Sequence, residues 1–267
     1  MDARTRRAWH AALVETDPDV KCARVAALRA AAAPDAGAES ADDPRPVPGR
    51  PAQPPLVAPR AVPRRGLGTR EGRAALAHAV AHIEFNAINL ALDAGWRFDA
   101  LPAAFYADWL SVAQDEARHF QLMRTRLREL GSDYGALPAH NGLWEAAEKT
   151  AHDPLVRMAL VPRVLEARGL DVTPGMIQRL REVGDHDTIA VLELILREEV
   201  RHVAIGTRWF RHLCAARGLE PDATFRRLLD AHGVRLHPPF NLDARRAAGF
   251  ADAELCGHEP AVPPAHA

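Results

Sequence analysis

Cysteine is scarce in this chain of 267 residues, which contains three, at positions 22, 214 and 256. They are odd in number, far apart and never spaced as C-x-x-C, which argues against a disulfide framework and against a cysteine zinc site. The sequence also lacks a run of about 18 apolar residues that could span a membrane, and its N-terminus has no apolar segment typical of a secretory signal. We therefore expect a cytoplasmic protein with no membrane partner.

An excess of charge of one sign is also absent, because 34 Lys and Arg residues balance 35 Asp and Glu residues. The chain as a whole is therefore not drawn to polyanions, and nucleic acid is not an expected partner. One local basic cluster lacks the interleaved aromatic residues of an RNA-binding surface, so we interpret it as a solvated face. It comprises Arg60, Arg64, Arg65, Arg70 and Arg73.

The dominant positive signal is helical periodicity in a chain that is 48% hydrophobic. Apolar residues recur every three or four positions in four long segments, which predicts four helices. The expected helices span 69–93, 102–130, a segment that starts at Asp153 and Pro154, and 185–217. Pro162 should bend the third helix just before Glu166, because proline cannot donate to the carbonyl of Met158.

Shorter elements are expected around these helices. A crossover at 132–152 contains a short helix at 143–150, and Thr173 with Pro174 should start a small extra helix that ends near 183. Residues 1–66 form an N-terminal helical segment and a Pro-rich arm that is expected to lie across the main domain. Residues 67–219 form the bundle, and 220–267 form short C-terminal helices, at 225–232 and 242–248, and a tail.

Carboxylates and imidazoles interrupt the apolar faces of all four long helices. Glu116 and His119 stand three residues apart on the second helix, and Glu199 and His202 repeat this spacing on the fourth, offset by about 83 residues. A single Glu-x-x-His arises by chance about once in such a chain. Glu84 on the first helix and Glu166 on the third are isolated inward carboxylates, and they complete a set of six.

This set has the chemistry of a dinuclear metal site. One Glu from each of two helices and Glu-x-x-His from the other two is the ligand pattern of di-iron and di-manganese carboxylate proteins. Residues three apart lie one turn apart on the same helix face, so Glu can bridge two ions while His binds one. The oxygen and nitrogen donors suit two iron ions, or manganese. The alternative is a set of buried ion pairs without metal.

Asp115 and Glu198 each precede a histidine of the set by four residues and are candidates to accept a hydrogen bond from its non-ligating ring N–H. The alternative is a pair of surface salt bridges, with Arg118 and with Arg201. Gly206, one turn past His202, leaves space for an oxidant or substrate or allows close helix packing.

Several stretches resemble a bacterial family catalogued as domain of unknown function 455. They are HIEFNAINLALDAGWRF, DEARHF, LEARGLD, REEVRH and the Pro-rich PGRPAQPPLVAPR. The stretch from about 67 to 219 resembles the ferritin-like superfamily, which implies an all-α ferritin-like four-helix bundle with a di-metal site. It implies no particular substrate, because oxygenases, radical-generating subunits, peroxidases and storage proteins share this fold.

Departures from better-known relatives narrow the expected function. Met123 occupies the place of the radical-forming tyrosine of ribonucleotide reductase, and Gly169 and Leu170 follow the third-helix Glu where bacterial monooxygenases have threonine. Ferritins lack the second complete Glu-x-x-His, which makes a storage cage a poorer fit. No rubredoxin-like cysteine pair is present, so any electrons for turnover must come from an external donor.

We therefore expect an oxidoreductase that activates O2 or peroxide to oxidise or hydroxylate an unknown substrate. A tRNA-modifying hydroxylase is one alternative, and it should carry a basic rim next to the metals. A non-catalytic metal-binding or storage protein is the other, and it should lack a channel to the site. A homodimer is compatible with the sequence.

Overall fold

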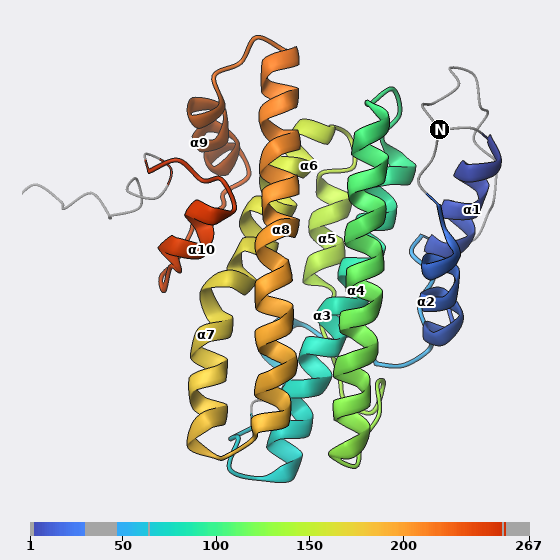
Figure 1. Ribbon diagram of the computed structural model, residues 1–267, viewed down its shortest axis with the longest axis vertical. Helices are drawn as coiled ribbons and strands as arrows, with labels where there is room; N and C mark the ends of the chain where they lie inside the picture. Colours follow the sequence, from blue (N-terminus) through green and yellow to red (C-terminus); the bar gives the residue numbers. More distant parts are fainter. Residues whose placement is uncertain (1–2, 30–46, 64, 253, 255–267) are drawn as a thin grey trace, which may run out of the picture.

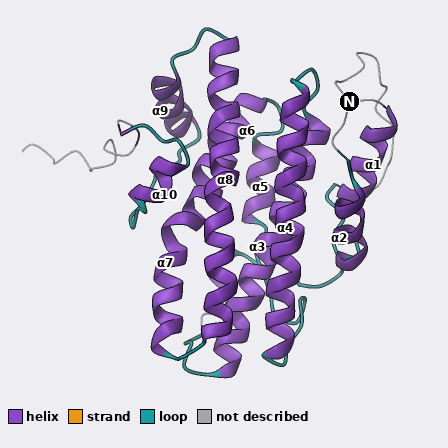
Figure 2. Ribbon diagram, in the orientation of Figure 1, coloured by secondary structure: helices purple, strands orange, loops and turns teal. Residues whose placement is uncertain are grey.

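The computed structural model describes residues 3–29, 47–63, 65–252 and 254. Every regular element in this part of the chain is helical, as Figure 2 shows, and the one β contact is an isolated bridge between Leu56 and Ala139. The prediction of an all-α fold is thus confirmed. No helix within the described ranges is both long and apolar enough to cross a membrane.

The centre of the molecule is formed by long helices that lie side by side (Figure 1). α3 (Arg70–Arg97) and α4 (Ala103–Glu129) pack along their length as an antiparallel pair joined by a short loop. The Thr69 side chain caps α3 by accepting a hydrogen bond from Gly72 N at 3.0 Å. The predicted limits of these helices differ from the observed ones by a few residues at most, except at the end of α3.

The second half of the centre is formed by α6 (Pro154–Leu160), η2 (Val161–Glu166), α7 (Ala167–Glu182) and α8 (His186–Ala216). η2 is a π-helical segment in which Ala167 N–H bonds to the Pro162 carbonyl, five residues back. Pro162 therefore disturbs the third helix just before Glu166, as expected. A Cβ on Gly206 of α8 would lie 2.3 Å from the Pro162 side chain, so this glycine serves close helix packing and not access to the site.

The expected helix start at Pro174 is wrong, because α7 runs through this proline from 167 to 182. A proline inside a helix leaves the carbonyl four residues earlier without its donor, which here is that of Leu170. Asn241 Nδ2 donates to this carbonyl at 3.2 Å. A side chain from the C-terminal segment thus makes a hydrogen bond in place of the missing one.

The N-terminal helices α1 (Ala3–Leu13) and α2 (Pro18–Ala27) lie against α3 and α4. Lys21 is fully buried, and its Nζ donates to the carbonyls of Leu13 and Gly49 and to Asn89 on α3. The described part of the Pro-rich arm, 47–63, contains the short helix η1 (Pro59–Ala61) and pairs with the crossover through Val57 N and the Ala139 carbonyl at 2.8 Å. Residues 30–46 of the expected arm lie outside the described residues.

The C-terminal helices α9 (Pro221–Ala231) and α10 (Leu242–Ala247) cover α6, α7 and α8. Arg163 of η2 is completely buried and pairs with Glu254. Its guanidinium lies 4.1 to 4.7 Å from the ring centres of three phenylalanines, at positions 210, 225 and 250. Arg245 of α10 pairs with buried Asp171 of α7 at 2.6 Å. The C-terminal segment therefore braces the bent helix that carries Glu166.

A buried ion pair joins the two halves of the fold. Arg157 of α6 and Asp93 of α3 are 1% and 0% exposed and lie 2.7 Å apart. The same guanidinium donates to Thr150 and to the carbonyl of Ala147, at the end of the crossover helix α5 (Gly142–Lys149). The Arg157 side chain thus connects α6 to both α3 and α5.

We expect the substitution Asp93→Ala to lower the free energy of unfolding by about 3–5 kcal/mol, because it leaves the buried Arg157 guanidinium without this carboxylate. Equilibrium unfolding in urea measures this difference. Asp19→Ala is the matched control, since Asp19 is 68% exposed where it pairs with Arg124, and it should cost less than about 1 kcal/mol. Equal losses in the two variants would contradict the structural importance of the buried pair.

Candidate metal centre

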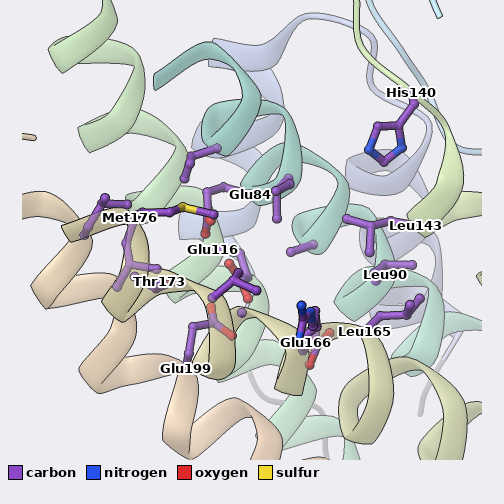
Figure 3. A pocket seen from close by; sticks show the side chains of 18 residues that line it. Glu84, Leu90, Glu116, His140, Leu143, Leu165, Glu166, Thr173, Met176 and Glu199 are labelled. Atoms are coloured by element: carbon purple, nitrogen blue, oxygen red, sulfur yellow. The ribbon is translucent and has the colours of Figure 1, made fainter. Parts of the chain in front are cut away.

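The fold brings the six candidate ligands together between four helices. Glu84 comes from α3, Glu116 and His119 from α4, Glu166 from the end of η2, and Glu199 and His202 from α8. Figure 3 shows the carboxylates of Glu84, Glu116, Glu166 and Glu199 gathered around one cavity. Both histidines are 0% exposed.

Short distances connect the side chains of this group. His119 Nδ1 lies 3.2 Å from Glu84 Oε2 and 3.4 Å from Glu116 Oε2. His202 Nδ1 lies 2.9 Å from Glu116 Oε1 and 3.3 Å from Glu199 Oε1. One donor atom from each of four side chains falls within a mutual distance of 4.8 Å, and these side chains are Glu84, Glu116, His119 and Glu199.

Despite their proximity, the inward atoms of the group have no hydrogen-bond partner within the described residues. They are Glu84 Oε2, both carboxylate oxygens of Glu116, Glu166 Oε2, and Nδ1 of His119 and of His202. Buried polar atoms are almost always hydrogen-bonded, and a buried carboxylate without a counter-charge is costly. Atoms that lack protein partners and converge on one volume are what a cation site requires, so the residues present fit a metal centre.

The outward nitrogen of each histidine is held by a carboxylate. His119 Nε2 lies 2.7 Å from Glu198 Oε2, and His202 Nε2 lies 3.2 Å from Asp115 Oδ2. A carboxylate accepts a hydrogen bond from Nε2–H, so Nδ1 is the ring nitrogen that faces the cluster. Asp115 and Glu198 thus contact the site histidines, but each contacts the histidine of the opposite helix. The expected pairing within one helix is wrong, because the ring of each histidine extends across the gap between α4 and α8.

Two arginines complete this crossed arrangement. Arg118 contacts both Asp115 and Glu198, and Arg201 contacts Asp115 from α8. Asp115 and Glu198 therefore take part in salt bridges as well as contacting histidines. The expected pair of Asp115 with Arg118 forms, but Glu198 pairs with Arg118 and not with Arg201, which contacts Asp115 instead. The arginines are nearly half exposed, so their main effect is to orient the two carboxylates and not to add much stability.

When no metal is bound, protons on the histidines and on Glu166 offset part of the negative charge of the cluster. Burial opposes the charge on His119, but the carboxylates of Glu116 and Glu84 outweigh it and raise its pKa to about 11. Glu199 and Glu116 likewise overcome burial and raise the pKa of His202 well above its usual value. Burial, with repulsion from Glu199, raises the pKa of Glu166 to about 8. Metal ions entering the site must displace these protons.

A cavity of about 210 Å³ adjoins the carboxylates. Glu84, Glu116, Glu166 and Glu199 line it, and most other lining residues are apolar and come from α3, α7 and α8. Ile83 of α3 lines this cavity and is 42% exposed, so the cavity meets the surface there. Sequence periodicity did not reveal the cavity.

Gly169 lines the cavity, although this position was not predicted from the sequence. It follows Glu166 by three positions, and a Cβ added there would meet no atom within 4 Å. A glycine in the middle of a helix, where no turn requires it, often has a packing or functional reason, and this could have indicated its role.

A second polar cluster is structural. His78 and His82 of α3 are buried, and burial lowers the pKa of each to about 4, so both are neutral. His78 Nε2 accepts from Gly135 N, and His82 Nδ1 lies 3.0 Å from the Tyr134 hydroxyl. These contacts hold the crossover loop on α3.

The comparison with known proteins agrees with the resemblance seen in the sequence. An uncharacterized protein of Haemophilus influenzae is 48% identical over 213 residues, which cover 77% of this chain and 74% of that protein. No solved structure gives a significant match. A family model described as protein of unknown function, DUF455, matches residues 14–256. The chain therefore belongs to the DUF455 family.

Proposed function

We propose that this chain is a ferritin-like di-metal carboxylate protein that activates O2 or peroxide to oxidise or hydroxylate a substrate. The observation that carries the proposal is the convergence of unpartnered carboxylate oxygens and Nδ1 atoms from four helices. Glu84, Glu116, His119, Glu166, Glu199 and His202 would hold two iron ions, or manganese. Four carboxylates would offset the charge of two divalent ions in a buried site.

The arrangement of the helices supports the ferritin-like part of the proposal. Two antiparallel helix pairs are connected by a long crossover, and each pair supplies one Glu and one Glu-x-x-His. This is the architecture expected of ferritin-like di-metal proteins with one crossover connection.

The protein's own contribution to the reaction would be binding and orientation. Glu198 and Asp115 orient the histidine rings so that Nδ1 would face the ions, and mostly apolar side chains line the cavity beside the carboxylates. When bound, a reduced iron pair supplies two electrons to O2. In a hydroxylation, R–H, O2, two electrons and two protons give R–OH and water, and an external donor must restore the electrons.

The cavity supports the catalytic proposal over the two alternatives. A storage or purely structural site has no need of a lined space next to its ligands. A tRNA-modifying enzyme requires unpaired basic groups near the metals. Among the described residues that line the cavity, Arg168 is the only Arg or Lys, and Arg118 and Arg201 lie outside the cavity, where they pair with Glu198 and Asp115. The Arg168 guanidinium donates to the carbonyls of residues 237–239.

Protein loaded with ferrous iron should bind about two ions per chain. Glu116→Ala should reduce this number to below one, because Glu116 lies close to both histidines. Glu193→Ala is the matched control, since Glu193 is exposed on α8, and it should leave the metal content unchanged. Metal analysis by mass spectrometry gives the answer, and an unchanged content in Glu116→Ala would contradict the proposed site.

Glu198→Gln should weaken metal binding by about 10–100-fold, because it removes the charged acceptor of His119 Nε2–H. Competition with a chelator of known affinity measures this change, and Glu193→Gln provides the control on the same helix. An affinity equal to that of the unchanged protein would show that Glu198 forms only a surface salt bridge.

The iron-loaded, reduced protein should consume O2 or react with peroxide. Stopped-flow absorbance and an oxygen electrode record this reaction, and the metal-poor Glu116→Ala protein serves as the blank. A fully loaded protein that reacts with neither oxidant would contradict the catalytic role and favour metal binding alone.

A further inference from the structure

We propose that the cavity beside the carboxylates binds a small, uncharged, apolar molecule as the substrate. The proposal rests on the function proposed above, and it adds the chemical class of the ligand. It also assigns Gly169 as the residue that keeps the binding space open.

The walls of the cavity set the polarity of the ligand. One part is lined by Leu90, Leu143 and Leu165, and Met176 lines the other part (Figure 3). The carboxylates lie between these two parts, so a molecule that fills the cavity places a C–H bond beside the metal-binding atoms. Apolar walls around a few polar groups are typical of small-molecule sites.

The basic side chains that line the cavity, Arg168 and His140, already make hydrogen bonds to the backbone. Arg168 Nη1 donates to the His237 carbonyl at 2.7 Å and to the Pro239 carbonyl at 3.0 Å. His140 Nδ1 accepts a hydrogen bond from Gly142 N. A ligand carboxylate or phosphate would therefore enter apolar surroundings that offer it little compensating charge, at a large desolvation cost. A cationic ligand would in turn need a free carboxylate, but Glu84, Glu116, Glu166 and Glu199 would be held by the metals in the proposed site. The ligand is accordingly neutral.

The volume of about 210 Å³ sets the size of the ligand. An apolar protein cavity of about 150 Å³ accepts benzene. This cavity therefore suits a molecule of one to two small rings, or a short branched chain, and exposed Ile83 marks its entrance.

Gly169 offers a direct test. A side chain at this position meets no atom at its Cβ, so Gly169→Leu can be accommodated by α7 and would occupy the cavity. Leucine also favours the helix more than glycine does, so folding should not suffer. Gly175→Leu is the matched control, because Gly175 is on the same helix, is exposed, does not line the cavity and has equal space at its Cβ.

Isothermal titration calorimetry with toluene, benzoate and AMP would test the proposal on the full chain, both metal-free and manganese-loaded. Toluene should bind with a stoichiometry of about one, and benzoate and AMP at least about tenfold more weakly. Gly169→Leu should weaken toluene binding at least about tenfold, while Gly175→Leu should bind like the unchanged protein.

Metal content, measured on the same samples, separates the two proposals. A protein that holds its metals but binds no toluene, or prefers benzoate or AMP, would overturn the assigned ligand class. Toluene binding that survives in Gly169→Leu would overturn the assigned cavity. If the chain takes up no metal but binds toluene, the di-metal function is contradicted, whereas the cavity is confirmed as a binding site for apolar molecules.

Discussion

The central constraint on this structure is the need to balance the negative charge of the buried carboxylates between the four long helices. Four carboxylates from four helices face two imidazoles, and several carboxylate oxygens have no hydrogen-bond partner in the described part of the chain. Without a cation the group must hold protons, which is why the pKa of His119 rises to about 11 and that of Glu166 to about 8. Bound divalent ions would replace those protons and supply the missing partners.

The surrounding contacts keep the ligand helices in place. The crossed pairs, Glu198 with His119 and Asp115 with His202, tie α4 to α8 just outside the cluster. The buried Arg157 connects α6 to α3, and Arg163, enclosed by aromatic rings, secures η2 to the C-terminal segment. The π-helical turn at Pro162 comes immediately before Glu166. The irregular helix that carries Glu166 is therefore supported by α3 and by the C-terminal segment.

Local sequence signals predict much of this arrangement. Thr69, Asp153 and Asp185 cap helices at the expected helix starts. The positions of four glutamates on the apolar helix faces were enough to predict that they meet, and these are Glu84, Glu116, Glu166 and Glu199. These features depend on residues close together in the sequence and on a regular helical period.

Features that depend on distant residues could not be predicted from periodicity. Pro174 seemed to require a new helix, but Asn241 satisfies the carbonyl that this proline leaves free. Arg157 and Arg163 are charged and yet buried, because Asp93 and Glu254 reach them from elsewhere in the chain. The crossed pairing of Asp115 and Glu198, and the open space at Gly169, likewise arise only when the helices pack.

Anomalous X-ray diffraction at the iron edge, from crystals of the iron-loaded protein, tests the central claim most directly. We expect two iron positions about 3.5–4 Å apart, between Glu116 and Glu199, with Nδ1 of His119 and of His202 as ligands. Iron that lies elsewhere, or two histidines that remain paired only with carboxylates at full iron loading, would contradict the account.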